Sequence, residues 1–373
     1  MSLPNSSTLK ARIAGLIAAQ GPISVAQYMT LALHDPQSGY YATRDPLGPK
    51  QQTKGGDFIT APEISQIFGE MLGLWLAEAW ENQGRPGKPV LMELGPGRGT
   101  LMADILRACK AAPDFLSEME VVLVEASPHL RAVQEEKLKG ARIRWQSQFE
   151  AEAGRPLFLV ANEFFDALPI RQYVKTERGW CERMVTAAND ELVFALAPAP
   201  APSSLIPESR AGAPEGGVYE TAPAAIALSE AIARHIQAHG GAALLIDYGY
   251  ARAGFGETLQ AVAGHRFADP LTSPGEADLS AHVDFIALGE AGRRAGAGVH
   301  GPVGQGALLA ALGIAARAAS LAAHHPAEAP ALQTALARLT GDDGMGQLFK
   351  ALAFLPRAAH AAPGFAGAAD AAA

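Results

Sequence analysis

A glycine-rich segment at residues 93–100 has the residue types of a nucleotide-binding turn. It reads Glu-Leu-Gly-Pro-Gly-Arg-Gly-Thr and lies between a predicted strand at 90–94 and a predicted helix at 100–108. Its acid and its three glycines are Glu93, Gly95, Gly97 and Gly99. Glycines there let the backbone approach a ligand, and the amino end of the following helix favours polar or anionic groups. A dinucleotide turn requires glycine at its sixth position, which is Thr100 here, so the NAD fingerprint fails.

A second acid, Glu125, follows the next predicted strand, at 121–124. A carboxylate at that place can bind a ribose diol through both oxygens. Together the two acids and the glycine turn resemble the first motif of S-adenosylmethionine (SAM) methyltransferases of the doubly wound class, where the leading acid, here Glu93, reaches the methionine amino group. The alternative is a tight turn with an accidental Glu93 and a solvated Glu125.

The elements that must position these residues alternate between strand and helix, which predicts a parallel sheet. Strands are predicted at 90–94, 121–124, 143–145, 157–161, 242–246 and 348–353. Apolar residues at helical spacing predict a helix at 9–19 and another at 64–80, the second preceded by a capping box from Thr60 to Glu63. A long insertion at 170–240 begins as antiparallel ribbon and then becomes rich in Ala and Pro.

The composition and charge of the chain argue against several classes of function. The chain has 373 residues, 49% of them hydrophobic, and its net charge is 30 Lys and Arg minus 38 Asp and Glu, or −8. An acidic balance argues against partners that are nucleic acids or anionic lipids. We expect no membrane insertion, because the apolar stretch at 306–316 is too short to span a bilayer. Two cysteines and histidines without metal-ligand spacing predict neither a disulfide framework nor a metal site.

Longer blocks of sequence resemble one family, the MidA-type methyltransferases. The first block reads Gly-Gly-Asp-Phe-Ile-Thr-Ala-Pro-Glu from residue 55. All the blocks that carry the resemblance lie at 55–70, 93–100, 161–169, 246–250, 278–285, 304–306, 312–314 and 345–350. This family contains the mitochondrial protein arginine methyltransferase that assists assembly of respiratory complex I.

The resemblance implies a fold, a cofactor and an activity. The fold is α/β: a doubly wound, Rossmann-like SAM-methyltransferase sheet with an N-terminal helical segment and an insertion after the fourth strand. The methyl donor is SAM, and the activity in the eukaryotic member is symmetric dimethylation of an arginine on a complex I subunit, so the implied partner is a protein. A bacterial protein would act in the cytoplasm and a eukaryotic one in the mitochondrial matrix.

The residues that would hold an arginine follow the fourth predicted strand. A guanidinium needs carboxylates that orient it through paired hydrogen bonds and leave one nitrogen able to attack. Asn162, Glu163 and Asp166 are placed at the carboxyl end of the sheet, where ligands bind in open α/β folds. Asn162 is predicted to contact the cofactor as well. On a helical turn Glu163 and Asp166 would share one side; alternatively, Asp166 caps a turn before Pro169.

Further candidate residues lie outside this sheet edge. His282, with Asp278, is expected in a later loop that folds over the site, where it would act on the substrate or be only a structural hydrogen-bonding group. Asp57 is predicted to close over the cofactor, and Glu63 is explained as the acid of the capping box. Asp247 and Tyr248 end the fifth strand, without an assigned role.

The predicted organisation has four parts. They are an N-terminal helical segment with a cofactor-covering loop at 1–85, a methyltransferase core at 86–169 and 241–358, an insertion at 170–240 that shapes the substrate cleft, and a flexible tail at 359–373. Two other functions stay open: methylation of a different nitrogen acceptor, such as a small molecule or a nucleic-acid base, and a non-catalytic assembly chaperone with a vestigial SAM pocket.

Overall fold

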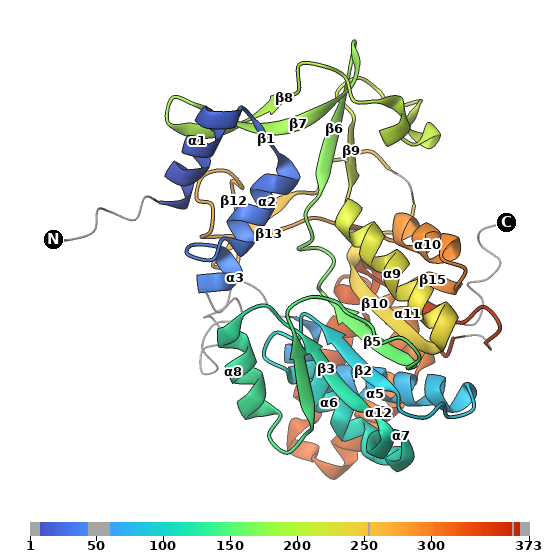
Figure 1. Cartoon of the computed structure of the whole chain (residues 1–373). Coiled ribbons are helices and arrows are strands. Elements are labelled where there is room, and N and C mark those ends of the chain that lie inside the picture. The colour runs from blue at the N-terminus through green and yellow to red at the C-terminus, as the bar shows by residue number, and fades with distance from the viewer. Residues whose placement is uncertain (1–7, 44–59, 253, 360–361, 366–373) are drawn as a thin grey trace. The chain divides into compact units, whose positions relative to one another are not determined.

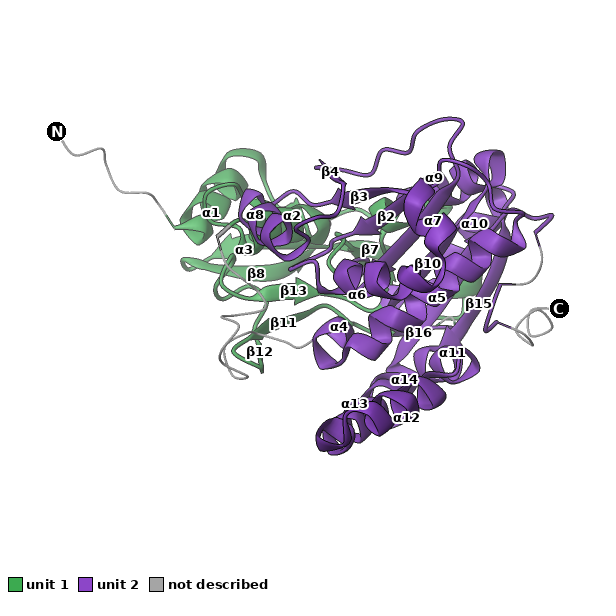
Figure 2. Ribbon diagram, turned by 90° about the horizontal axis from the view of Figure 1, so that it is seen from below, with its two compact units in different colours: residues 1–58, 167–225, 252–282 green, residues 59–166, 226–251, 283–373 purple. Residues whose placement is uncertain are grey.

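The computed structural model describes residues 8–43, 60–252, 254–359 and 362–365. The chain divides into two compact units (Figure 2). Unit 1 comprises residues 1–58, 167–225 and 252–282, and unit 2 comprises residues 59–166, 226–251 and 283–373.

Unit 2 contains a mixed eight-stranded sheet with the order β15-β16-β10-β5-β2-β3-β4, to which β14 adds by pairing with β10 (Figure 1). Its strands are β2 (Val90–Leu94), β3 (Glu120–Val124), β4 (Ile143–Gln146), β5 (Leu157–Asn162), β10 (Gly241–Tyr250), β14 (Val283–Asp284), β15 (Gly298–Gly304) and β16 (Phe349–Leu355). The neighbours from β10 to β4 are parallel, whereas β16 is antiparallel to both β10 and β15. All six predicted strands are confirmed, and β14 and β15 are additions that the sequence did not predict.

Helices cover both faces of this sheet. The helices of unit 2 are α4 (Ala61–Ile64), α5 (Gln66–Asn82), α6 (Thr100–Ala108), α7 (Pro113–Glu118), α8 (Pro128–Lys137), α9 (Pro223–His239), α10 (Phe285–Arg294), α11 (Gln305–Ala311), α12 (Ile314–His324), α13 (Ala329–Thr340) and α14 (Met345–Leu348). α5 and α6 share a buried cluster with Leu91, Phe158 and Leu244. α10 packs on the opposite face, against β16: a Cβ atom added to its Gly292 would lie 2.5 Å from Cε1 of Phe354. The sheet is therefore buried on both sides, as its apolar strands require.

The helix predicted at 64–80 is divided in two. Ser65 has an extended backbone, with φ −161° and ψ 139°, and its side chain accepts a hydrogen bond from the Ile67 N–H at the start of α5. Thr60 forms no side-chain cap, so the predicted capping box is wrong. The physical reason is that Ser65 is itself a favourable N-cap residue and begins a new helix one turn later.

Unit 1 has two smaller sheets. Its elements are α1 (Leu9–Gln20), β1 (Ile23–Ser24), α2 (Val25–His34), α3 (Tyr40–Thr43), β6 (Arg171–Thr176), β7 (Gly179–Ala188), β8 (Glu191–Leu196), β9 (Val218–Thr221), β11 (Gln260–Ala263), β12 (Arg266–Ala268) and β13 (Asp278–Ser280). One sheet has the order β1-β7-β6-β9 with β8 paired to β7, and the other has the order β12-β11-β13. The predicted first helix and antiparallel ribbon are confirmed. Asp278 lies in β13, where Val262 of β11 is its partner, rather than in the predicted loop.

The two units differ from the predicted segments in three places. α4 and α5 belong to unit 2, because the apolar side of α5 is buried in the same core as the sheet. Most of α9 also belongs to unit 2, although it falls inside the predicted insertion. Residues 252–282 belong to unit 1, where α2 packs against β13 and the Tyr41 hydroxyl donates to Asp278 Oδ1 at 2.8 Å.

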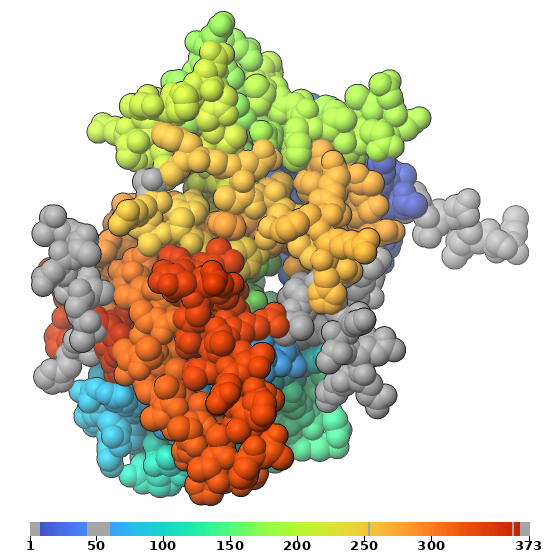
Figure 3. All heavy atoms as spheres, turned by 180° about the vertical axis from the view of Figure 1, so that it is seen from behind, coloured from blue at the N-terminus to red at the C-terminus, as the bar shows by residue number. Residues whose placement is uncertain are grey.

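The late apolar helices form part of the surface of unit 2. α12 and α13 pack against each other, and Figure 3 shows their outer side in orange. Among the described helices no single one is long and apolar enough to cross a membrane, and the pair α11 and α12, bent by 65°, reaches that length only when the two are taken together.

Candidate active site

The glycine turn connects β2 to α6, as predicted. Gly95, Gly97 and Gly99 all have positive φ values, of 63°, 51° and 75°. A Cβ atom on Gly95 would lie 2.7 Å from Cδ2 of Phe164, so the backbone approaches that ring more closely than any side chain allows. The turn therefore needs glycine both for its conformation and for its packing.

Glu93 is buried directly before this turn. Only 3% of the residue is exposed, and its Oε2 atom has no hydrogen-bond partner among the described residues. Burial raises the pKa of Glu93 to about 8, and the charges of Asp104 and Glu125 add to the rise. An unpartnered carboxylate oxygen with a raised pKa favours a cationic partner, as the ammonium group of SAM would be.

Glu125 lies at the carboxyl end of β3, next to the glycine turn. Its Oε1 atom accepts a hydrogen bond from the Ser127 N–H at 2.8 Å. The side chain of Gln134, which is fully buried on α8, donates to the Gly97 carbonyl at 2.7 Å and to Glu125 Oε2 at 3.4 Å. Gln134 also accepts from Trp145 Nε1 at 2.8 Å. One amide thus holds the predicted ribose acid against the glycine turn.

Gln134 was not predicted from the sequence, although a signal was present. Leu130 and Gln134 are the two buried residues of α8 and are four positions apart, so the glutamine occupies the apolar side of the helix. A polar residue at a buried helical position needs hydrogen-bond partners. The partners here are the glycine turn and Glu125.

The acids after β5 lie on a tight turn rather than on a helix. Glu163 has a positive φ of 50°, which is rare for a residue with a Cβ atom. Its Oε1 atom accepts hydrogen bonds from the Ala61 N–H at 2.9 Å and from Asn162 Nδ2 at 3.1 Å. The predicted helical spacing of Glu163 and Asp166 is wrong, because the chain turns at Glu163 instead of beginning a helix. Asn162 is buried, and its Oδ1 atom has no hydrogen-bond partner among the described residues.

A third carboxylate, Asp247 of β10, is joined to the same turn. Its Oδ2 atom accepts hydrogen bonds from the backbone N–H groups of Phe164, Phe165 and Asp166. Burial raises the pKa of Glu163 to about 7, and burial together with the charges of Asp166 and Glu163 raises the pKa of Asp247 well above its ordinary value. Burial and mutual repulsion disfavour negative charge on these neighbouring carboxylates. A bound cation would offset both effects and is therefore favoured here.

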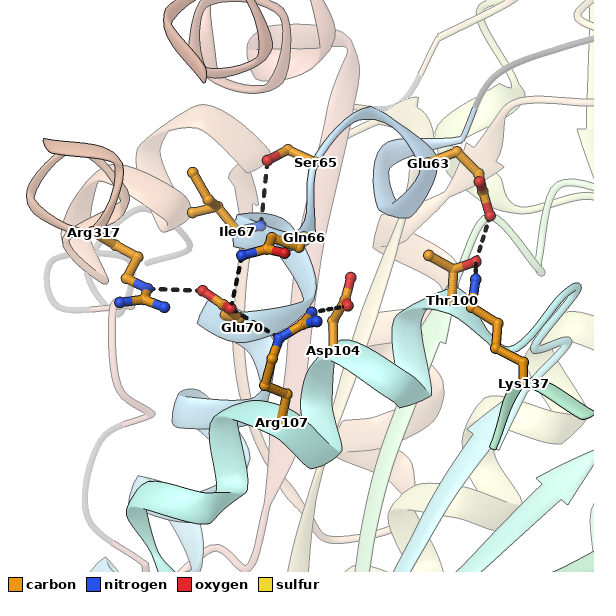
Figure 4. Close-up of polar contacts among 10 residues, drawn as sticks. All are labelled: Glu63, Ser65, Gln66, Ile67, Glu70, Thr100, Asp104, Arg107, Lys137 and Arg317. Atoms are coloured by element: carbon orange, nitrogen blue, oxygen red, sulfur yellow. Dashed lines mark hydrogen bonds and ion pairs between the residues drawn. The ribbon is translucent and has the colours of Figure 1, made fainter. Parts of the chain in front are cut away.

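α4 forms hydrogen bonds both with α6, which follows the glycine turn, and with Glu163, on the turn after β5. Figure 4 shows the contact with α6. The Glu63 Oε1 atom accepts a hydrogen bond from Thr100 Oγ1 at 2.5 Å, at the first residue of α6, and Lys137 of α8 donates to the same hydroxyl. The Ala61 N–H, two residues earlier, donates to Glu163. Glu63 therefore positions α6 instead of capping its own helix.

A buried acid lies behind α6, on α5 (Figure 4). The side chain of Glu70 is only 4% exposed and accepts from Arg107 Nε at 3.2 Å and from Arg317 Nε at 2.7 Å. Arg107 also pairs with Asp104, one turn earlier on α6. These charge-assisted bonds join α5, α6 and α12, so α6, the helix that follows the glycine turn, is anchored in its last turn as well as at its amino end.

For two predicted site residues the role stays a prediction. His282 belongs to unit 1, where its backbone N–H donates to Thr258 Oγ1 at 2.9 Å, and its role stays a prediction. Asp57 lies outside the described residues. Among the described residues, no three His, Cys, Asp or Glu side chains are grouped so that they could hold a metal ion.

The geometry fits SAM in three respects. Among the described residues, Glu93 Oε2 and Asn162 Oδ1 are buried and have no hydrogen-bond partner. The glycine turn lets backbone approach a ligand, and Glu125 is held at the end of β3. The donor set thus offers an acid for an ammonium group and an acid for a ribose diol. These residue assignments are predictions from the chemistry of the side chains.

Comparisons with known proteins identify the family of this chain. Residues 71–303 match the model of a family described as putative S-adenosyl-L-methionine-dependent methyltransferases. The chain is 37% identical over 370 residues to the mitochondrial protein arginine methyltransferase NDUFAF7 of Mus musculus, covering 91% of this chain and 82% of the relative. It is 40% identical over 346 residues to NDUFAF7 of Danio rerio, covering 84% and 78%.

A solved structure extends the comparison to the fold. A protein of Burkholderia thailandensis, crystallised with bound S-adenosylhomocysteine, superposes with a TM-score of 0.85 at 32% identity and covers 98% of both chains. The predicted fold class and the SAM dependence of the family are confirmed. This chain belongs to the family of SAM-dependent methyltransferases that contains the mitochondrial protein arginine methyltransferase NDUFAF7.

Proposed function

We propose that this protein transfers methyl groups from SAM to an arginine side chain of a protein substrate. The observation that carries the proposal is the acidic turn after β5, where Glu163, Asp166 and the buried Asp247 lie together. A guanidinium is a planar cation that binds carboxylates through paired hydrogen bonds. The names of the NDUFAF7 relatives point to the same acceptor.

The turn supplies what the acceptor needs in such a transfer. Bound SAM supplies an electrophilic methyl group on a sulfonium. Glu163 would orient one guanidinium nitrogen and accept the proton that this nitrogen loses when the new N–C bond forms. A pKa raised to about 7 suits a group that must hold and release a proton near neutral pH. Asp166 would draw the positive charge toward the other nitrogens.

The finer parts of the proposal concern the product and the partner. We propose symmetric dimethylation of an arginine in a subunit of respiratory complex I, as an aid to its assembly. The relatives are named as mitochondrial proteins. For this chain the location is a prediction: the cytoplasm in a bacterium and the mitochondrial matrix in a eukaryote.

Identification of the methylated residue tests the proposal. The purified protein is incubated with SAM that carries a trideuterated methyl group and with an extract of cells that lack this enzyme. Tandem mass spectrometry then locates the label. Label on one or a few arginines is the expected result. Label on another side chain, a small amine or a nucleic-acid base would show that this group, and not arginine, is the acceptor. If S-adenosylhomocysteine still binds but no label is transferred, the result would favour the assembly-chaperone alternative.

A further inference from the structure

Asp247 has an unusual set of hydrogen bonds. Residue Asp247 is almost completely buried, at 1% exposure, yet every hydrogen bond that it accepts from the described residues comes from backbone. Oδ2 accepts from Phe164 at 3.1 Å, from Phe165 at 2.9 Å and from Asp166 at 3.2 Å. Oδ1 accepts from the Tyr248 N–H at 2.9 Å. Both oxygens are thus used to hold main chain.

These bonds close a turn that would otherwise be unfavourable. Glu163 has left-handed backbone, with φ 50°, and its own N–H donates to the Ile246 carbonyl of β10 at 2.9 Å. The next three N–H groups then converge on a single carboxylate oxygen, in the manner of the backbone concavities that bind anions. A strained residue persists only where its surroundings fix it, and such residues gather at functional sites.

We propose that Asp247 is a positioning residue that fixes the two acceptor-binding acids, Glu163 and Asp166, by holding the backbone between them. The inference rests on the proposed function. We assign Asp247 no direct grip on the acceptor, because its side chain is buried and the four hydrogen bonds described for it all come from backbone N–H groups. Its position in β10, paired in register with β5, places the carboxylate under the turn.

The test compares Asp247→Asn with Glu163→Gln and with the double variant. Asparagine has only one acceptor oxygen, so its amide group must face either the three N–H groups of the turn or the Tyr248 N–H. Asp284→Asn is the matched control, because the Asp284 side chain also accepts two backbone N–H bonds in unit 2, at the start of α10. If Asp247→Asn does not fold, Asp247→Glu keeps both oxygens on a longer side chain and takes its place.

Three measurements are made on each full-length variant. Hydrogen exchange of the amides at 164–166 reports the turn, calorimetric titration with S-adenosylhomocysteine reports the cofactor side, and transfer of labelled methyl from SAM to the cell extract reports the reaction. We expect Asp247→Asn to speed exchange, to leave the affinity within about threefold, and to slow transfer about 100-fold, the scale of a misplacement of about 1 Å. Glu163→Gln should leave the exchange unchanged.

The double variant decides how Asp247 acts. If it acts through the turn, Asp247→Asn slows transfer much less in the Glu163→Gln background than in the wild type, because one of the two acids that it positions is already absent and only Asp166 is left to be misplaced. Effects that multiply would mean that Asp247 acts directly on the acceptor and would overturn the proposal, as would unchanged exchange in Asp247→Asn. Normal transfer by Glu163→Gln, or no transfer by the wild type, would instead overturn the proposed function, and the inference with it.

Discussion

Replacement of Glu93 by glutamine should make the cofactor-free protein more stable while weakening cofactor binding. Glu93 is 3% exposed, and burial raises its pKa to about 8 in the folded protein, against an ordinary value of 4.5. The folded state therefore holds this proton more tightly than the unfolded state does. Its contribution to stability is complete below pH 4.5 and is lost as the pH rises through about 8.

The size of the effect follows from the same two pKa values. Each pH unit between them costs about 1.4 kcal/mol of the free energy of unfolding. Relative to Glu93→Gln, whose side chain is neutral at every pH, the wild type should lose about 1 kcal/mol by pH 5, about 3 kcal/mol by pH 7 and about 4 kcal/mol by pH 8. Glutamine has nearly the same shape as protonated glutamate, so packing changes little.

Urea unfolding of the cofactor-free proteins at pH 5, 6, 7 and 8 measures this difference. Fluorescence of Trp75 and Trp80, which are buried in unit 2, reports the transition. Glu118→Gln, which removes an exposed carboxylate, is the control and should follow the wild type. A stability difference between wild type and Glu93→Gln that stays constant from pH 5 to pH 8 would refute the reasoning, because it would show that the carboxylate is not desolvated.

Three further variants and one pH profile test other parts of the site. Gly95→Ala should lower the affinity for S-adenosylhomocysteine at least about tenfold in calorimetry, because of its positive φ and the nearby phenylalanine ring, whereas Gly15→Ala, with open space around it, should bind like the wild type. Gln134→Leu removes the bridge between the glycine turn and the ribose acid and should lower that affinity about tenfold, the scale of one hydrogen bond. Glu70→Ala leaves two arginines without their buried partner and should reduce the free energy of unfolding by about 1–3 kcal/mol in urea titrations. The kcat/KM for methyl transfer should rise with pH up to about 7 and then level off, because Glu163 must be ionised to accept a proton. A flat profile from pH 5 to pH 8 would show that Glu163 is not the proton acceptor.

The parts of the site that could be predicted best are those whose residues are close together in the sequence. The strand, the glycine turn and the helix of residues 90–108 are contiguous, so spacing alone indicated where Glu93 and the glycines would lie. Glu125 could be predicted because the strands are parallel and place their carboxyl ends at one edge of the sheet. The break at Ser65 was missed because an uninterrupted apolar pattern hid a favourable N-cap residue inside it.

The role of Asp247 could not be read from local pattern. It is 81–83 residues from the three N–H groups that it binds, and only the register of β5 against β10 brings them together. The turn at Glu163 depends on that long-range contact, which is why a helical spacing was predicted for the acids instead. The contacts of α4 and of Gln134 could not be predicted for the same reason, because each forms hydrogen bonds with elements that are distant in the chain.

The most direct test of the central claim, that an acidic turn beside a SAM site grips a protein arginine, is the single-turnover rate of methyl transfer by Glu163→Gln at saturating SAM. The acceptor is the protein that the wild type labels in the cell extract, and the affinity for S-adenosylhomocysteine is measured on the same preparation. We predict that the affinity is retained and that transfer falls at least about 100-fold, as expected when a group that orients and deprotonates the acceptor is removed. Transfer within twofold of the wild type, with the affinity retained, would contradict the account.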